Sequence, residues 1–256
     1  MVNENKIKKR LAAGEKVLGC FLGLPGIAAA ELLTLIGYEC VLIDREHGQA
    51  SMGEATAQMV AAKAAGGTAF LRIPKLDLGE VKYALDAGVS GIMVPMISSV
   101  AEAELLAKAC AYPPVGIRGT APYLIRASSY GLYGGEYPKI AREELVVIAQ
   151  IETKEGIEAV EDIAAVPGID LLFAGPSDIS ASLGYLGQAD HPEVRAAIDK
   201  ILAAAKKHKK WAGITPSTQH NAAARFKAGF DLVLAGSDVG FMREGATAAL
   251  NAQKLI

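Results

Sequence analysis

The chain has 256 residues, with 26 lysines and arginines against 28 aspartates and glutamates, so its formal net charge at pH 7 is −2. Hydrophobic residues make up 51% and charged residues 21%, a composition typical of a folded protein and not of a disordered one. This charge balance supplies no basic field to attract nucleic acid, and no apolar stretch is long enough to predict a membrane span. We therefore expect neither a nucleic-acid partner nor a membrane.

The amino-terminal segment and the cysteines indicate in which cellular compartment the protein is found. Residues 1–16 are polar and charged, without the apolar stretch of a signal peptide. The three cysteines, Cys20, Cys40 and Cys110, are odd in number and widely spaced. They predict buried reduced thiols in place of a disulfide framework or a zinc site. We expect a cytoplasmic protein.

Short apolar runs alternate along the chain with amphipathic stretches, most of which end at glycine or proline. The runs predict strands over 17–24, 40–44, 69–73, 91–97, 145–151, 170–174, 211–214 and 232–235. The stretches between them predict helices over 25–36, 53–65, 78–87, 100–111, 156–165, 192–208, 219–228 and 239–254. The segment 115–139 is predicted to be irregular, and it is longer than a scaffold loop needs to be.

Eight strand–helix pairs in a chain of this length predict an α/β protein with the TIM (β/α)₈ barrel fold. The strands are nearly continuous apolar runs, as expected for a parallel sheet that is buried on both faces. No G-x-G-x-x-G motif follows the first strand, which disfavours a dinucleotide-binding fold. We expect one domain over residues 1–256.

In such a barrel the reacting groups lie at the carboxyl ends of the strands. Glu152 and Asp178 follow the fifth and sixth strands, which are neighbours. Two carboxylates, completed by water and substrate oxygens, are a usual ligand set for Mg²⁺ or Mn²⁺. The alternative is that these are helix caps or surface carboxylates, and Asp178 could cap the turn that follows it.

Two further groups follow the second and third strands. Asp44 and His47 are three residues apart, and a carboxylate can orient a histidine that moves a proton near neutral pH. The alternative is a solvated loop histidine. Arg72 lies in an apolar run, where a permanent cation suits a carboxylate or an enolate oxygen. Its alternative is a buried ion pair with Glu46 or Asp44.

Two glycine-containing turns could bind anions. The turn over 174–178 can point main-chain N–H groups at a substrate carboxylate. The turn over 235–238 could form a phosphate cup, but Asp238 would repel a phosphate there. We therefore favour the first turn.

Seven stretches, in this order, resemble the HpcH/HpaI aldolase family of metal-dependent (class II) pyruvate aldolases, including 4-hydroxy-2-oxoheptanedioate and 2-keto-3-deoxy sugar acid aldolases. They are 42–47 (LIDREH), 71–74 (LRIP), 85–88 (LDAG), 93–96 (MVPM), 112–119 (YPPVGIRG), 150–153 (QIET) and 175–180 (GPSDIS). The resemblance covers nearly the whole chain. It implies a TIM barrel assembled as a homohexamer, with the last helix exchanged between subunits. It also implies reversible retro-aldol cleavage of 4-hydroxy-2-oxo acids to pyruvate and an aldehyde.

The resemblance also implies roles for individual residues. Glu152 and Asp178 match the metal ligands, with Mg²⁺ or Mn²⁺ expected and Co²⁺ as a further candidate. Arg72 matches the arginine that holds pyruvate and its enolate oxygen. The remaining matches are the acid–base histidine (His47), its partner (Asp44), pyruvate-binding positions (Gln150 and the main chain at Ser177 and Asp178) and an acid near the metal waters (Glu46).

The sequence departs from the family pattern at several rim positions. Arg45 stands where the family usually has glycine, and it could change the substrate charge preference or form an interface ion pair. The segments 120–124, 215–217 and 237–239 also differ, which leaves the aldehyde half of the substrate open.

Three other functions are weighed against this one. A Schiff-base aldolase needs a desolvated lysine inside the barrel, and no lysine falls in a predicted strand body; Lys75 and Lys154 lie past strand ends. A related lyase acting on a CoA thioester needs a basic site for a nucleotide, and no loop suits one. A non-catalytic barrel subunit is disfavoured by the complete set of Asp44, His47, Arg72, Glu152 and Asp178.

Overall fold

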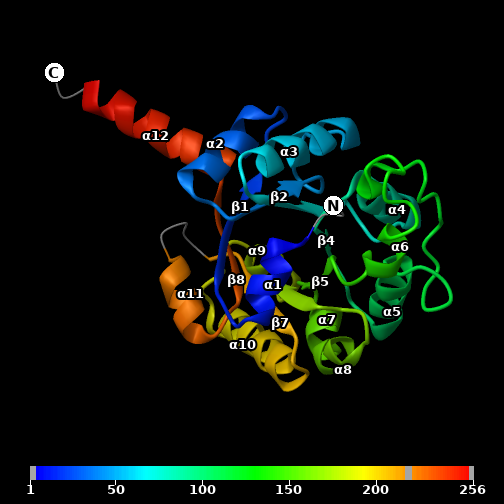
Figure 1. Ribbon diagram of the computed structural model, residues 1–256. Helices are drawn as coiled ribbons and strands as arrows, with labels where there is room; N and C mark the ends of the chain where they lie inside the picture. The colour runs from blue at the N-terminus through cyan, green and yellow to red at the C-terminus, as the bar shows by residue number, and fades with distance from the viewer. Residues whose placement is uncertain (1–3, 217–220, 254–256) are drawn as a thin grey trace.

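Eight parallel strands form a closed barrel in the order of the sequence, as the computed structural model shows for residues 4–216 and 221–253 (Figure 1). The predicted TIM barrel is therefore confirmed. The strands are β1 (Val17–Leu22), β2 (Cys40–Asp44), β3 (Thr68–Arg72), β4 (Gly91–Val94), β5 (Val146–Ile151), β6 (Leu171–Ala174), β7 (Trp211–Ile214) and β8 (Leu232–Ser237).

Helices surround the barrel and connect its strands. They are α1 (Lys6–Ala12), α2 (Ala28–Ile36), α3 (Met52–Ala64), α4 (Leu78–Ala87), α5 (Val100–Ala109), η1 (Arg126–Ser128), α6 (Tyr137–Ile140), α7 (Lys154–Glu158), α8 (Val160–Ala165), α9 (Pro176–Ser182), α10 (Pro192–Lys207), α11 (Ala222–Ala228) and α12 (Asp238–Gln253). No described helix is both long enough and apolar enough to cross a membrane.

Side chains alternate between the two faces of every strand, and this alternation positions the site. One set packs under the helices in the larger apolar cluster, for example Val41 and Ile43 of β2. The other set points into the barrel, for example Cys40 and Leu42. The rings of Phe70 and Phe173 fill much of the interior, because glycines on the next strands leave room for them. A Cβ at Gly91 would lie 2.6 Å from the Phe70 ring, and one at Gly213 would lie 2.5 Å from the Phe173 ring.

Helix α1, which the sequence analysis did not predict, closes the amino end of the barrel. Ile7 and Leu11 are buried in the interior cluster, and the Trp211 indole N–H donates to the Leu11 carbonyl at 3.1 Å. In Figure 1 this helix lies over the centre of the ring of strands. The Asn5 side chain accepts from the Lys8 N–H at 3.0 Å and so begins the helix.

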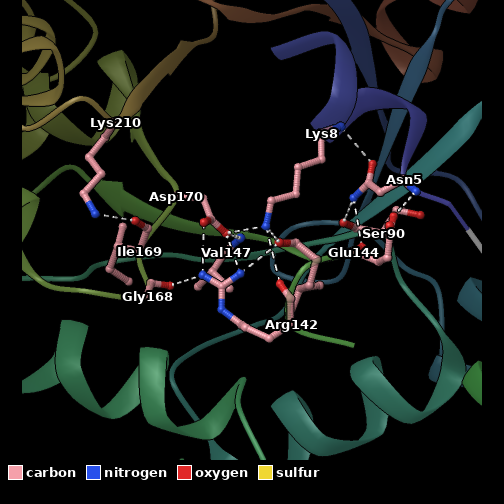
Figure 2. Close-up of polar contacts among 11 residues, drawn as sticks. Asn5, Lys8, Ser90, Arg142, Glu144, Val147, Gly168, Ile169, Asp170 and Lys210 are labelled. Atoms are coloured by element: carbon pink, nitrogen blue, oxygen red, sulfur yellow. Dashed lines mark hydrogen bonds and ion pairs between the residues drawn. The ribbon is translucent and has the colours of Figure 1, made fainter. Parts of the chain in front are cut away.

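A polar network fixes α1 and the loops at this end of the barrel (Figure 2). Asp170 lies 3.0 Å from Arg142 and 3.7 Å from the Lys8 ammonium, and it accepts from the Val147 N–H at 2.8 Å. The Asn5 side chain donates to the Ser90 carbonyl at 2.6 Å. These contacts join α1 to the loops before β4, β5 and β6, so this end of the barrel serves stability.

Three differences from the predicted elements bear on function. The predicted helix over 156–165 is two short helices, α7 and α8, and the segment 115–139 contains η1 and the start of α6. Helix α9 begins directly after β6, where the sequence analysis predicted a turn and no helix, because Pro176 is suited to the first position of a helix. Helix α12 extends away from the barrel beside α2 (Figure 1), and Asp238 is its one buried residue among those described.

Candidate active site

The alternation along the strands sends four predicted site residues to the same end of the barrel. Asp44 and Arg72 are the last residues of β2 and β3, and they are direct neighbours in the sheet register. Gln150 lies in β5, and Glu152 is the first residue after it. Asp44 has the inward parity of Leu42, and Gln150 and Glu152 have that of Ile148. Their side chains therefore crown the apolar interior at the carboxyl rim.

A cavity of about 560 Å³ opens at this rim. Six predicted site residues line it, namely Asp44, His47, Arg72, Gln150, Ser177 and Asp178. Glu152 is 1% exposed and is not itself part of this lining, but its carboxylate contacts the lining residue Gln150. The structure thus brings together all seven residues for which the sequence predicted a catalytic, binding or ligating role. Phe21, Thr215, Pro216, Ser237 and Val239 form another part of the wall.

Arg72 is held in one orientation by two carboxylates. Its Nε donates to Asp44 Oδ1 at 2.9 Å and its Nη2 donates to Oδ2 at 2.7 Å. Nη1 lies 2.9 Å from Glu46 Oε2, and the guanidinium carbon is 5.2 Å from the centre of the Phe21 ring. The ion pairs weighed as an alternative role for Arg72 are therefore both formed. These ion pairs fix the orientation of the guanidinium, and Arg72 still lines the cavity.

His47 is not oriented by Asp44 in the way the sequence analysis expected. Asp44 Oδ1 accepts from the main-chain N–H groups of Glu46 at 3.0 Å and of His47 at 3.3 Å. An aspartate that ends a strand favours this turn over a contact with a ring three residues later. The imidazole is largely exposed, with Nε2 3.8 Å from Glu46 Oε2. Glu46 is therefore the carboxylate beside the imidazole.

Glu152 is a buried carboxylate with few charges to balance it. Its Oε1 accepts from the Met96 N–H at 3.0 Å, and its Oε2 accepts from Gln150 Nε2 at 2.6 Å. Its pKa is raised to about 7, chiefly by burial; the negative charges of Asp178 and Glu46 also raise it, whereas the Met96 N–H and Arg72 lower it. Met96 adopts the left-handed conformation with φ of 58°, which aims this N–H at the carboxylate.

Gly175 makes room for that carboxylate. Its φ of −102° is open to any residue, but a Cβ there would overlap Glu152 Oε2 and lie 3.0 Å from Gln150 Nε2. The first residue after β6 is therefore glycine for steric reasons. Asp178 is the third residue of α9, which has no side-chain cap, so the alternative role of Asp178 as a helix cap is not observed.

The donor set suits a divalent cation. Asp44, Glu46, Glu152 and Asp178 bring four carboxylates together with one permanent cation, Arg72. Each oxygen of Glu152 accepts one hydrogen bond and keeps a second lone pair. In the described part of the chain, no three Asp, Glu, His or Cys side chains could hold a metal by themselves. Glu152 and Asp178 could therefore supply two ligands and leave the other positions to water and substrate.

Asp238 has a structural role that the sequence analysis missed. This buried carboxylate accepts from the N–H groups of Gly23 at 2.9 Å, Leu24 at 3.0 Å and Val239 at 2.8 Å. It joins the loop after β1 to the start of α12, and both segments line the cavity. The signal was present in the sequence, since an aspartate one residue after a strand and at a helix start is a frequent acceptor of main-chain N–H groups.

Comparisons with known proteins identify the family of the chain. The family model described as HpcH/HpaI aldolase/citrate lyase matches residues 17–244. A hydroxypyruvate/pyruvate aldolase of Paraburkholderia phytofirmans is 38% identical, with 96% of each chain covered. A 5-keto-4-deoxy-D-glucarate aldolase of Klebsiella pneumoniae is 34% identical over 98% of this chain and 97% of its own.

A crystal structure of a family protein from Burkholderia cenocepacia superposes with a TM-score of 0.93 at 34% identity. That match covers 98% of this chain and 99% of the other. With a family model over most of the chain, full-length relatives and a shared barrel, this chain belongs to the HpcH/HpaI aldolase/citrate lyase family.

Proposed function

We propose that the whole chain, residues 1–256, is one aldolase domain that depends on a divalent metal. It cleaves 4-hydroxy-2-oxo acids to pyruvate and an aldehyde, and it catalyses the reverse addition. The observation that carries the proposal is the buried carboxylate of Glu152, which interacts with the charges of Asp178 and Arg72, two residues that line an open cavity. Divalent-metal dependence is general among aldolases of this family.

Glu152 and Asp178 hold the metal ion, for which Mg²⁺ or Mn²⁺ is expected and Co²⁺ is a further candidate. When bound, the ion supplies positive charge that stabilises a developing enolate oxygen. Gln150 and the main-chain N–H groups at Ser177 and Asp178 bind the keto acid, because the first turn of a helix leaves its N–H groups without intrahelical acceptors.

Arg72 donates to the carboxylate or the enolate oxygen of the keto acid. Its donors are pre-aimed by Asp44, so they need no reorganisation as the negative charge forms. Asp44 therefore acts through Arg72. In the cleavage direction the C3–C4 bond breaks, its electron pair forms the enolate, and the C4 hydroxyl becomes the aldehyde carbonyl.

His47 takes the proton of that hydroxyl. Glu46, 3.8 Å from the imidazole, stabilises the positive charge that the ring then carries. The protonated His47 ring then gives up this proton, the enolate gains one at C3, and pyruvate forms. Thr215, Pro216, Ser237 and Val239 face the aldehyde half; Ser217, which the sequence analysis placed on the same rim, lies outside the described residues.

The enzyme acts as a cytoplasmic homohexamer in which α12 is exchanged between subunits. Support comes from the exposed apolar side chains of α12, namely Met242 and Leu250, and of the neighbouring α2, namely Leu35 and Ile36. Sedimentation of the purified chain tests the assembly. A monomer at micromolar concentration would contradict it.

The decisive test is pyruvate release followed with lactate dehydrogenase across a panel of 4-hydroxy-2-oxo acids, with and without Mg²⁺, Mn²⁺ and Co²⁺. Removal of the metal is expected to lower turnover by about 10³-fold or more, because the ion carries the main electrostatic contribution. Activity that survives complete chelation would refute the proposal.

A covalent adduct after borohydride treatment with pyruvate would favour a Schiff-base mechanism. No lysine lines the described cavity, and Lys75 and Lys154 are exposed. Turnover of a CoA thioester alone, or no turnover at all, would favour the other two functions weighed above.

A further inference from the structure

The side chain of Arg45 braces the loop that carries Glu46 and His47. Arg45 follows the last residue of β2, and its N–H continues the sheet by donating to the Arg72 carbonyl at 2.9 Å. Because Asp44 points into the barrel, the next side chain points outward. There its guanidinium forms an ion pair with Glu80, in the first turn of α4. The Arg45 side chain is only 14% exposed.

The same guanidinium also closes the loop on itself. Arg45 Nε donates to the carbonyl of Ala50 at 3.4 Å, across the segment that contains both active-site side chains. Glu80 is itself fixed, because its N–H donates to the Asp77 side chain at 3.0 Å at the start of α4. One side chain therefore ties the beginning of the loop to its end and to a rigid helix.

This anchoring matters because the imidazole of His47 has little else to hold it. Its side chain is 65% exposed, and its charged neighbour is Glu46 on the same loop. The main-chain contacts of the loop lie on the cavity side, at Asp44 and at Gly23, whose carbonyl accepts from the Gln49 N–H at 3.1 Å. On the outer side, Arg45 provides the contact to α4.

We propose that Arg45 and Glu80 form a positioning pair for the aldol reaction, which holds the loop so that the His47 ring meets the C4 hydroxyl. This inference rests on the proposed function. Arg45 lies outside the cavity lining and its guanidinium is occupied, so it acts through the loop and does not read the charge of the substrate. The sequence analysis considered an ion pair of Arg45 across a subunit interface; here the Arg45 guanidinium pairs with Glu80 of the same chain.

The test uses three variants of the full-length chain: Arg45→Ala, Glu80→Gln and the double variant. Each single change removes the ion pair, and Glu80→Gln keeps the shape of a half-buried side chain. The control is Lys108→Ala, which removes an exposed pair with Glu104 on α5. We measure kcat for cleavage with saturating Mn²⁺, the Kd of pyruvate by calorimetry, and the thermal midpoint.

Both single variants are expected to lose about tenfold in kcat, since a displaced general base forfeits part of its 10²–10⁴-fold contribution. The Kd of pyruvate stays within about twofold of the wild-type value, because Gln150, Glu152 and the Asp44 carboxylate that pairs with Arg72 lie on strands or next to them and not on the braced loop. The double variant is no slower than the slower single variant, because both changes break the same contact. The control keeps wild-type kcat.

Wild-type kcat in both single variants would overturn the inference, as would additive losses in the double variant. A parallel loss of kcat, pyruvate affinity and thermal midpoint would also overturn it, because that pattern indicates a merely structural pair. The proposed function is checked separately by the metal dependence of the wild-type chain, which involves neither Arg45 nor Glu80.

Discussion

Gly175 offers a sharp test of the site, because a single methyl group added there reaches the buried carboxylate directly. In Gly175→Ala the new Cβ would overlap Glu152 Oε2 and lie 3.4 Å from Glu152 Cβ. Ordinary carbon contacts need about 3.5–4.0 Å, so the carboxylate must retreat by roughly 1 Å. The backbone conformation at residue 175 is open to alanine, so the strain falls on Glu152.

A shift of this size at a metal-binding group is expected to lower kcat/KM by about 10²-fold and to weaken Mn²⁺ binding. The added volume in a packed region is expected to cost about 1–3 kcal/mol of unfolding free energy. The assay is pyruvate release at several Mn²⁺ concentrations, with urea unfolding for stability. Gly53→Ala is the matched control, because the atom nearest to its new Cβ is Ser51 Oγ at 3.9 Å. Wild-type metal affinity and turnover in Gly175→Ala would refute the placement of Glu152 at the metal.

Three further predictions follow from the same contacts. Arg72→Lys keeps the charge but not the paired donors, so kcat/KM is expected to fall by about 10²-fold in the coupled assay; a loss under threefold would show that charge alone suffices. Burial raises the pKa of Glu152 to about 7, so a metal must displace a proton below that pH, and Mn²⁺ affinity measured by electron paramagnetic resonance is expected to fall about tenfold per pH unit below pH 7. Because the folded state raises this pKa from 4.5, the unfolding free energy of the metal-free chain is also expected to decrease as the pH rises from 4.5 to about 7. Metal affinity and stability that do not change with pH would contradict this prediction. Asp238→Asn places an amide against three main-chain N–H groups and is expected to cost about 1–3 kcal/mol in urea unfolding, which an unchanged midpoint would contradict.

The barrel could be predicted from the sequence because its strands are apolar on both faces and are separated by clear helix ends. The polar rim followed from the same pattern, since Asp44, Arg72 and Glu152 stand at the ends of largely apolar runs. Helix α1 was missed because it is short and highly charged. Its two buried residues, Ile7 and Leu11, have helical spacing and follow the cap at Asn5.

The contacts within the site could not be predicted, because they depend on where loops return in space. Asp44 was expected to hold the ring of His47, but the turn after β2 uses its carboxylate for main-chain N–H groups and for Arg72. The partner of Arg45 is 35 residues away, on a helix that the barrel brings alongside. The left-handed conformation of Met96 has no signal in the sequence, because it is imposed by the surrounding fold.

The closure of the amino end by α1 has a consequence for the order of catalytic events. The apolar stack and this helix leave the carboxyl rim as the way in and out of the described cavity. A keto acid bound beside Arg72 and Gln150 therefore cannot leave until the aldehyde above it has left. We therefore expect a kinetic sequence in which the keto acid arrives first and departs last, with the aldehyde exchanging above it, and product-inhibition patterns would reveal this order.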